Sequence, residues 1–461
     1  FMVAQAGTGA KPGYQWRDVG MEFPRTMTYW PIGKAWVDYL NRCHYLLQQG
    51  TFVADFLYYH GNRGPVAMPA KFHMQPPKPE GFDCDLVNAH ALLTRASVKD
   101  ERVAFPDGMS YRYLVLRADN TDALTPAVLE KLRELVSGGV TLIGHPPARI
   151  FGYEGFPASD EDFERLRAEI WGRNPGPSGS RTLGSGRVLW GPSLEETVKQ
   201  DRLAPDLEIV EDQATKALPD SVMSGLIGPG FDYVHRKAGP VDLYFLANLR
   251  NAEATGTFTF RCKGRPQVWN PVDGSIQGIT DYENLEGGRT RMSLNFEARQ
   301  SLFVVFGSDA PAEETYHNNE LVFDHGLPGP WKVTFDTAWG GPGEVGFNDL
   351  SDWKDHSDNG IKYYSGTATY TRTFDLPPGL RRSKRPIHLD LGSVKDMAKV
   401  TLNGTPIGVV WCEPFHLEIT GAVKPTGNVL SIDVVNKWSN RLMGDEVLEE
   451  SYTTGNASHD T

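Results

Sequence analysis

The chain turns from helix to strand within Trp30–Gly50 and Thr51–His60, which read WPIGKAWVDYLNRCHYLLQQG and TFVADFLYYH. Pro31 suits the first turn of a helix, and Gly50 suits a left-handed helix end. The run that follows has no polar alternation, as expected of a strand covered on both faces. We therefore expect a helix that closes one domain and leads directly into the first strand of another. The apolar residues that predict the helix recur at helical spacing: Trp36, Leu40, Cys43 and Leu47.

Length and charge limit the class of protein. The 461 residues predict about three domains. The formal net charge of -12 argues against partners such as nucleic acid or an anionic membrane surface, which need clustered positive charge. No apolar run approaches the roughly 20 residues that cross a bilayer. We expect no nucleic-acid or membrane partner.

The ends and the cysteines give two further expectations. The sequence begins Phe1-Met-Val-Ala, without an initiator methionine, so we expect a piece of a longer protein whose leader cannot be assessed. The cysteines are far apart and form no CxxC pair, which predicts buried free thiols rather than a disulfide framework or a zinc site. They are Cys43, Cys84, Cys262 and Cys412.

Residues 1–50 predict one strand–loop–helix unit. Phe1–Gly7 is a short apolar strand, and a long polar and aromatic loop follows it up to the helix entry. In a (β/α)8 barrel, such loops form the active-site face. We expect 1–50 to be the C-terminal remnant of a (β/α)8 catalytic barrel.

Residues 51–203 alternate between strands and helices, which predicts a flavodoxin-like α/β domain with a parallel sheet. The expected strands are 52–59, 111–116, 140–144 and 187–190, and the expected helices are 85–94, 125–137 and 160–171. Thr125 and Pro126 provide a helix cap and a first-turn proline. The Gly/Pro/Ser stretch 172–186 is expected to be a loop.

The rest of the chain predicts β-structure. Residues 204–318 form a small antiparallel β-domain that ends in a linker over 308–320. Residues 319–461 contain short strands separated by turns, which predicts a β-sandwich. Asn403-Gly404 between two strands is a type I′ hairpin signal.

The α/β domain is not expected to be catalytic. It has no G-x-S-x-G elbow, P-loop or G-x-G-x-x-G motif. An amidotransferase would need a nucleophilic cysteine on a strand-to-helix turn. His145-Pro146 follows the strand that ends at Gly144, and Cys84 precedes a helix without following a strand.

The loop before Trp30 is the candidate site. Glu22 could act as an acid or base, and Arg25 could bind a hydroxyl or a carboxylate. Trp16, Tyr29 and Trp30 could stack on a sugar ring. The alternative is an ordinary ion pair between Glu22 and Arg25, with the aromatic residues packing the helix entry. Glycoside hydrolysis needs two carboxylates, and one loop is not expected to supply both.

The last domain could present a carbohydrate-binding face formed by Trp339, Trp353 and Trp411. The alternative is that these rings brace the sandwich. Asp445 and Glu446 could be calcium ligands, although loop acids are usually only solvated. The sequence predicts no definite metal site.

Several motifs resemble a known family. Arg25–Pro31, Tyr39–Gly50 and Val53–Tyr59 resemble the end of the catalytic barrel in family 106 glycoside hydrolases, the α-L-rhamnosidases. The same helix and strand are similar to the barrel exit into the amidotransferase-like domain of family 42 β-galactosidases. Six motifs resemble the galactose-binding-like sandwich of family 106 and family 2 enzymes: Gly329–Phe335, Tyr363–Tyr370, Leu389–Val394, Leu402–Gly404, Trp411–Phe415 and Val435–Asp445.

The resemblance implies an inverting hydrolase that releases terminal L-rhamnose from polysaccharides or glycosides, with a calcium ion in the barrel. It implies a periplasmic or extracellular enzyme. The catalytic carboxylates and calcium ligands would lie upstream of Phe1, and Glu22 departs from the family pattern, so this chain alone is expected to be inactive. Two alternatives stay open: a non-catalytic carbohydrate-binding or scaffolding protein, and a family 2-like β-glycosidase.

Overall fold

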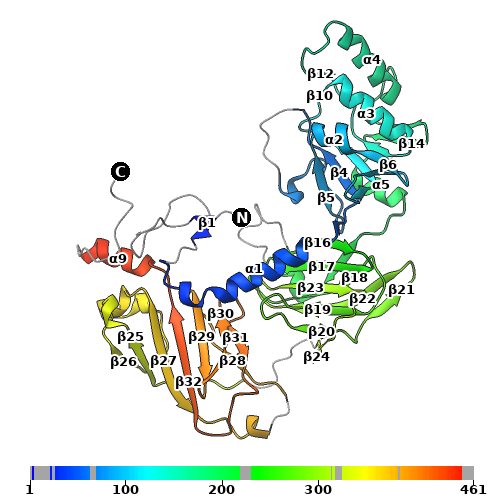
Figure 1. Ribbon diagram of the computed structural model, residues 1–461. Coiled ribbons are helices and arrows are strands. Elements are labelled where there is room, and N and C mark those ends of the chain that lie inside the picture. Colours follow the sequence, from blue (N-terminus) through cyan, green and yellow to red (C-terminus); the bar gives the residue numbers. More distant parts are fainter. Residues whose placement is uncertain are drawn as a thin grey trace. The chain divides into compact units, whose positions relative to one another are not determined.

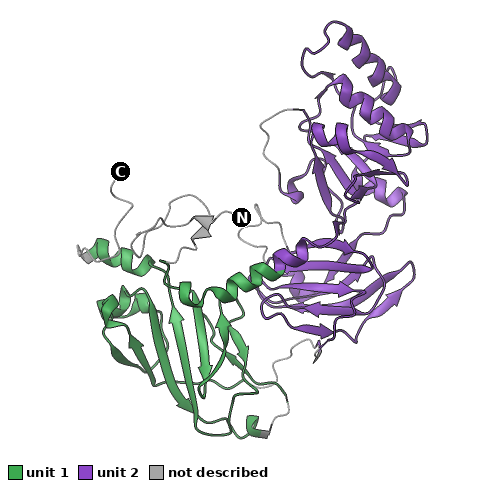
Figure 2. Cartoon of the chain, viewed as in Figure 1, with its two compact units in different colours: residues 1–42, 319–461 green, residues 43–318 purple. Residues whose placement is uncertain are grey.

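The computed structural model describes residues 3–4, 21–22, 26–62, 69–218, 230–312, 314–316, 324–382 and 385–448. These form two compact units, one of residues 1–42 with 319–461 and one of residues 43–318 (Figure 2). The expectation of a multidomain protein with α/β and β parts is confirmed: the model has several antiparallel sheets and one mixed, mainly parallel sheet (Figure 1).

The helix predicted after Trp30 is present. A 3-10 turn, η1 (Trp30–Ile32), has Pro31 in its first turn, and α1 (Lys34–Leu47) follows. Only Cys43 of α1 is fully buried. Gly50 has φ 57°, and a Cβ there would lie 1.9 Å from the carbonyl oxygen of Lys237. Glycine is therefore required where the chain leaves the helix.

The mixed sheet lies in the unit of residues 43–318. Its strand order is β13-β14-β11-β9-β4-β5, in which the five parallel strands follow the order 5-4-3-1-2 of their appearance in the chain. Only the edge strand β13 is antiparallel. The bounds are β4 (Phe56–Tyr59), β5 (Cys84–Val87), β9 (Tyr113–Leu116), β11 (Thr141–Ile143), β13 (Gly179–Leu183) and β14 (Gly186–Trp190).

Helices cover both faces of this sheet. Leu57 and Tyr59 of β4 pack in one core with α2 (Ala89–Arg95), α3 (Pro126–Ser137) and α4 (Ala158–Trp171). Phe56 and Tyr58 face a second core with α5 (Leu194–Gln200). The predicted cap of α3 is confirmed, since the Thr125 hydroxyl accepts a hydrogen bond from the Val128 amide. Smaller elements are η2 (Lys71–His73), β6 (Ser97–Lys99), β7 (Arg102–Ala104), β8 (Ser110–Tyr111), β10 (Ala123–Leu124) and β12 (Arg149–Ile150).

Two predictions for this region were wrong. Residues 84–87 form the strand β5 rather than the start of a helix, because they pair with β4, and Asn88 caps the helix only afterwards. Part of the predicted loop 172–186 is the strand β13, which forms a hairpin with β14.

The second part of this unit consists of two sheets around an aromatic core. One has the order β15-β18-β22-β21 and the other β24-β20-β19-β23-β17-β16-β3. The bounds are β3 (Thr51–Phe52), β15 (Leu207–Glu211), α6 (Gln213–Lys216), β16 (Phe231–Ala238), β17 (Val241–Asn248), β18 (Ala254–Phe260), β19 (Pro266–Trp269), β20 (Ile276–Gly278), β21 (Glu283–Leu285), β22 (Arg289–Phe296), β23 (Ser301–Phe306) and β24 (Glu314–Thr315).

The predicted strand 52–59 is divided between two sheets. Thr51 and Phe52 pair with β16, whereas Phe56–Tyr59 form the interior strand β4 of the mixed sheet. Asp55 lies at the division and is 2% exposed. Its carboxylate is 2.7 Å from the Arg261 guanidinium, and Arg112 lies 3.8 Å away. A buried carboxylate is retained because the arginine neutralises it.

The charged contacts of Arg261 extend into the two sheets around the aromatic core, which we call the β-part of this unit; the mixed sheet with its helices is the α/β part. Arg261 also reaches Asp206, at 3.2 Å, and Asp206 is 3.0 Å from Nδ1 of His235. Nε2 of His235 is 3.0 Å from Asp242. Both ring nitrogens therefore face carboxylates, and only the imidazolium can donate to both.

The C-terminal β-domain, defined here as residues 324–448, contains a six-stranded antiparallel sheet of order β26-β25-β27-β32-β29-β30 and a two-stranded sheet, β28-β31, that shares its core. Asn403 and Gly404 both have positive φ, so the predicted type I′ turn is confirmed. The bounds are β25 (Trp331–Phe335), η3 (Thr337–Trp339), β26 (Glu344–Phe347), η4 (Trp353–Asp355), α8 (Asn359–Lys362), β27 (Thr367–Phe374), η5 (Leu380–Arg382), β28 (His388–Asp390), β29 (Met397–Leu402), β30 (Thr405–Val410), β31 (His416–Glu418), β32 (Asn428–Val435) and α9 (Ser439–Leu448).

Replacing Asp55 by asparagine is expected to destabilise the unit of residues 43–318 by about 3–5 kcal/mol, because the substitution leaves buried arginine charge uncompensated. Urea unfolding measures this change. Glu195→Gln is the control, since Glu195 pairs with Lys199 on the surface and its loss is expected to cost less than about 1 kcal/mol. Equal effects of the two substitutions would contradict the role given to Asp55.

The contacts of His235 with Asp206 and Asp242 predict that the stability of this unit depends on pH. Burial disfavours the charged ring, but the hydrogen bonds with Asp206 and Asp242 outweigh it, so the pKa of His235 is raised above its ordinary value of 6.5. The stabilisation is complete below about pH 6.5 and is lost as the pH rises through the folded-state pKa. Unfolding free energies measured from pH 6 to 9 should fall, and His235→Gln should flatten this decline. An unchanged slope in the variant would exclude His235 as its source.

Candidate functional site

The segment of residues 26–32 is held against the C-terminal β-domain, within one compact unit. Met27 is 3% exposed and Tyr29 is 7% exposed. Both pack in a small apolar core with Met397, Val435 and Trp438. The segment that follows Arg25 is therefore part of the core of this unit.

Two hydrogen bonds fix the same segment. The Trp438 indole Nε1 donates to the carbonyl oxygen of Thr26 at 2.9 Å, and the Thr28 hydroxyl donates to the carbonyl oxygen of Asn436. Asn436 is itself held, because its Nδ2 donates to the carbonyl oxygen of Tyr364 at 2.9 Å. The contacts join residues about 400 positions apart in the chain, and we refer to them as the 26–28/436–438 clamp.

The residues predicted for the loop site fall in different surroundings. Trp16 and Arg25 lie outside the described residues, and so does the side chain of Glu22. The backbone of Glu22 belongs to a short strand, β2 (Met21–Glu22), which pairs in parallel with β1 (Val3–Ala4), where the sequence predicts a loop. Tyr29 is buried in the small apolar core beside the clamp, whereas Trp30 is 46% exposed.

The three tryptophans predicted for a carbohydrate-binding face are not brought together in one place. Trp353 is 6% exposed, and its indole Nε1 donates to the Tyr370 hydroxyl at 2.6 Å, so its ring belongs to the core. Trp411 is half-buried, with its ring 5.0 Å from that of Tyr39. Trp339 is 37% exposed and lies 5.4 Å from the Trp438 ring. Trp339 and Trp411 therefore both lie beside the clamp, because Trp411 packs against the same small apolar core as Trp438.

Sequence reasoning missed Trp438 and Asn436 as functional candidates. The motif Val435–Asp445 supported the family resemblance, but Asp445, as a candidate calcium ligand, was the one residue in it that was given a role. Within it, the Arg441 guanidinium lies 3.0 Å from the Asp445 carboxylate, so this proposed calcium ligand has a cationic neighbour. Among the described residues, no group of three or more acidic, histidine or cysteine side chains could hold a metal ion.

The α/β part has a polar cluster at the carboxyl ends of β4 and β9. In open α/β sheets, ligands bind where the strand order reverses, which is at this pair of strands. Here the Arg117 guanidinium binds Asp119 through two hydrogen bonds, of 3.1 and 2.6 Å, and its Nη1 lies 2.8 Å from Nδ1 of His60. A guanidinium only donates, so Nδ1 accepts and the ring proton is on Nε2. The arginine is used internally, and the cluster is not a phosphate site.

The cysteine considered for nucleophilic chemistry is inert in this structure. Cys84 is buried at the start of β5. Burial, with a contribution from Asp83, raises the pKa of its thiol to about 12. A thiol with such a pKa is not a nucleophile at neutral pH.

The helices were also compared with the length and apolar character needed to span a bilayer. None of the helices in the described ranges meets both conditions.

Comparisons with known proteins point to one family. The model of glycoside hydrolase family 106, described as alpha-L-rhamnosidase, matches residues 2–284. The solved structure of a rhamnosidase from Novosphingobium sp. PP1Y is 29% identical, with a TM-score of 0.79 over 97% of this chain and 41% of that chain.

More distant similarities are also found. A protein of Formosa agariphila with the provisional name beta-glucuronidase is 22% identical over 95% of this chain and 54% of its own length. A family 42 β-galactosidase from G. stearothermophilus is 11% identical, with a TM-score of 0.33 over 58% of this chain and 42% of its own. The chain therefore spans about half or less of the length of these relatives.

The clamp predicts a local effect of Trp438→Phe. The substitution keeps a ring in the apolar core but removes the donor to Thr26, so exchange of the amides in residues 26–32 should accelerate by roughly fivefold, the equivalent of about 1 kcal/mol. Hydrogen exchange with mass spectrometry measures this change. Trp331→Phe is the control, because the Trp331 indole N–H has no hydrogen-bond partner among the described residues. Equal exchange rates in both variants would rule out the clamp.

Proposed function

Because this chain belongs to glycoside hydrolase family 106, the α-L-rhamnosidases, we propose that it is the C-terminal part of an enzyme that hydrolyses terminal α-L-rhamnosyl residues of polysaccharides or glycosides. The observation that supports this most directly is the family match over residues 2–284, together with a 29% identical rhamnosidase structure over nearly the whole chain. A carbohydrate substrate follows from the family.

We place the catalytic carboxylates upstream of Phe1. Glycoside hydrolysis uses a pair of carboxyl groups on opposite sides of the bond, and we do not expect one loop, whose acidic residues are Asp18 and Glu22, to supply both. The coverage of 41% of the Novosphingobium rhamnosidase is in keeping with a catalytic barrel that lies mostly before this sequence. A calcium ion, if the enzyme uses one there, would be held by the same upstream region.

The proposed domains assign a role to each part. Residues 1–50 end the barrel, and the parallel pairing of β1 with β2 supports this. Residues 51–203 are a flavodoxin- or amidotransferase-like domain, supported by a parallel strand order equivalent to 2-1-3-4-5. Residues 204–318 form a small β-domain, and residues 319–461 a galactose-binding-like sandwich.

The clamp suggests that the last domain fixes the position of the loop that contains Arg25 and Trp30. Trp438 and Asn436 fix Thr26 and Thr28, which directly follow Arg25. An active-site loop has to be held close to its productive geometry, and a rigid sheet does this better than another loop. We propose that Trp438 and Asn436 are positioning residues for a substrate contact made by Arg25 and Trp30.

A second candidate is a β-glycosidase, favoured by the provisional name of the Formosa relative, which spans 95% of this chain. The experiment is to express the longer protein that contains this chain and to assay it with aryl α-L-rhamnoside, aryl β-D-glucuronide and aryl β-D-galactoside. We expect cleavage of the rhamnoside by the longer protein and none by residues 1–461 alone. Cleavage of only a β-glycoside would replace the proposal by the second candidate.

A non-catalytic carbohydrate-binding role is distinguished in the same assay. If the longer protein cleaves no glycoside, but its migration through a gel is retarded by rhamnose-containing glycans in that gel, it binds these glycans and the hydrolase proposal is wrong. In an active enzyme, Trp438→Phe should lower kcat by about tenfold or less while the fold is kept, because it loosens the segment after Arg25 without removing a catalytic group. Circular dichroism of the variant separates this effect from unfolding.

A further inference from the structure

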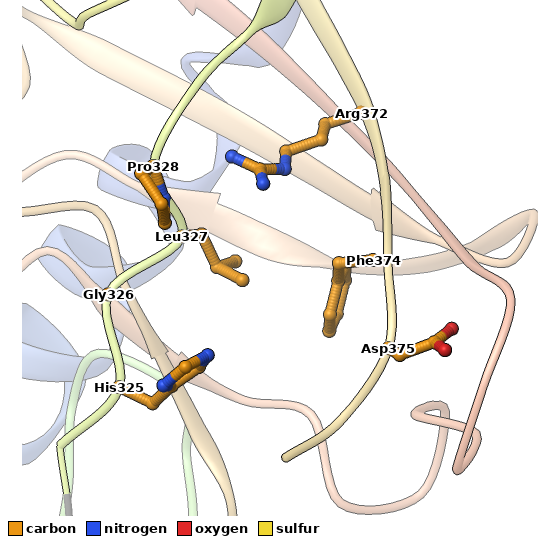
Figure 3. Close-up of a pocket in the computed structure, with 7 residues that line it drawn as sticks. All are labelled: His325, Gly326, Leu327, Pro328, Arg372, Phe374 and Asp375. Atoms are coloured by element: carbon orange, nitrogen blue, oxygen red, sulfur yellow. The ribbon is translucent and has the colours of Figure 1, made fainter.

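The C-terminal β-domain has an open groove of about 770 Å³ that the proposed function does not use. One wall is the segment that leads to β25, and the other is the end of β27 (Figure 3). This volume is in the range of small-molecule sites. The residues that line the groove are His325, Gly326, Leu327, Pro328, Arg372, Phe374 and Asp375.

Arg372 is the unusual residue of this groove. Its guanidinium lies over the ring of the buried Trp331, 5.5 Å from the centroid. Its Nη1 is buried without a hydrogen-bond partner among the described residues, which also provide no carboxylate in ion-pair distance. By contrast, the buried Arg250 is paired with Glu211 at 2.9 Å. A half-buried cation without an anion is costly unless a ligand supplies one.

The surroundings of Arg372 are apolar on one side and polar on the other. Leu327 and Phe374 pack against the core of the domain and also line the groove. Figure 3 shows their side chains between the two walls, with Arg372 above them, whereas the Asp375 carboxylate points away from this space on the other side of the strand. Asp375 accepts a hydrogen bond from the Gly427 amide at 2.7 Å, and its carboxylate lies 3.8 Å from the Arg381 guanidinium, so its charge is used within the domain.

We propose that this groove binds a sugar that carries an oxyanion, either the carboxylate of a hexuronate or a sulfate ester. The Arg372 guanidinium binds the oxyanion, because its planar donors match two oxygens of such a group. Phe374 and Leu327 contact the apolar face of the pyranose ring. The groove thereby retains acidic glycans. The inference extends the proposed function to a substrate feature, but it is tested by binding alone, so it can fail while the hydrolase proposal stands.

The test is isothermal titration calorimetry on the 461-residue chain. The probes are D-glucuronate, glucose 6-sulfate, glucose, acetate and inorganic sulfate. We expect an acidic sugar to bind at least about tenfold more tightly than glucose and than either free anion, since the charged contact and the ring contact act together. Preference for glucuronate or for the sulfate ester identifies the source of the oxyanion. No binding of either, or equal binding of the free anions, would overturn the proposal.

Variants assign the binding to the groove. Arg372→Gln should reduce the affinity for the acidic sugar by at least about tenfold and leave the weak affinity for glucose unchanged, and Phe374→Leu should weaken both. Lys332→Gln is the matched control, since it removes one positive charge from the paired surface residue Lys332 on β25. Arg372→Lys keeps the charge and should retain part of the affinity.

Thermal unfolding without ligand gives an independent readout. An arginine whose charge is not compensated by a carboxylate contributes little to the stability of the ligand-free protein. The Arg372→Gln variant should therefore have the same melting temperature as the parent, or a higher one. A large loss of stability in this variant, with unchanged sugar binding in Arg372→Lys and Phe374→Leu, would show that Arg372 is a structural residue and that the proposal is wrong.

Discussion

The buried pair of Asp55 and Arg261 is the constraint on which the unit of residues 43–318 depends. Asp55 lies between two strands that belong to different sheets, and Arg261 directly follows β18 of the β-part. The α/β part and the β-part are therefore joined by charge as well as by chain connectivity. The pair continues through Asp206 to His235, so protonation of one histidine is linked to the same junction.

The C-terminal β-domain combines three kinds of contact. Its apolar core stabilises the sheets, and the 26–28/436–438 clamp holds a segment from the other end of the sequence. In the groove, Nη1 of Arg372 has no hydrogen-bond partner among the residues that the structure describes. The first two lower the free energy of the folded state. The third is tolerated at a cost in stability, which is common where a protein binds a ligand.

Local sequence signals predicted the local structure well. Thr125-Pro126, Gly50 and Asn403-Gly404 each specify a backbone conformation by themselves, and each is found as predicted. The errors concern pairing with distant residues. Residues 84–87 become a strand because β4 lies beside them. Residues 52–59 are divided because β16 pairs with Phe52 at one end and β9 pairs with Phe56–Tyr59 at the other. No window of the sequence contains this information.

The candidate site was predictable only in part, for a similar reason. The family motifs directed attention to Arg25 and Trp30, but the role of Trp438 depends on a contact across the whole chain. Arg372 gave no signal in the sequence, because an arginine in a strand is ordinary, and only the fold shows that no carboxylate of the described residues lies within ion-pair distance of it. Trp353 and Trp339 look alike in the sequence, and only the fold distinguishes a core ring from an exposed one.

The clamp also has a consequence for how the protein is made. Thr26 and Trp438 are separated by 412 positions. At roughly 5–20 residues per second, a ribosome needs about 20 to 80 s to produce the second after the first. During that interval the apolar side chains of Met27 and Tyr29 have no partner from the last domain. Apolar surface that stays exposed during synthesis favours aggregation, so we expect the yield of folded protein to depend on how quickly the last domain follows.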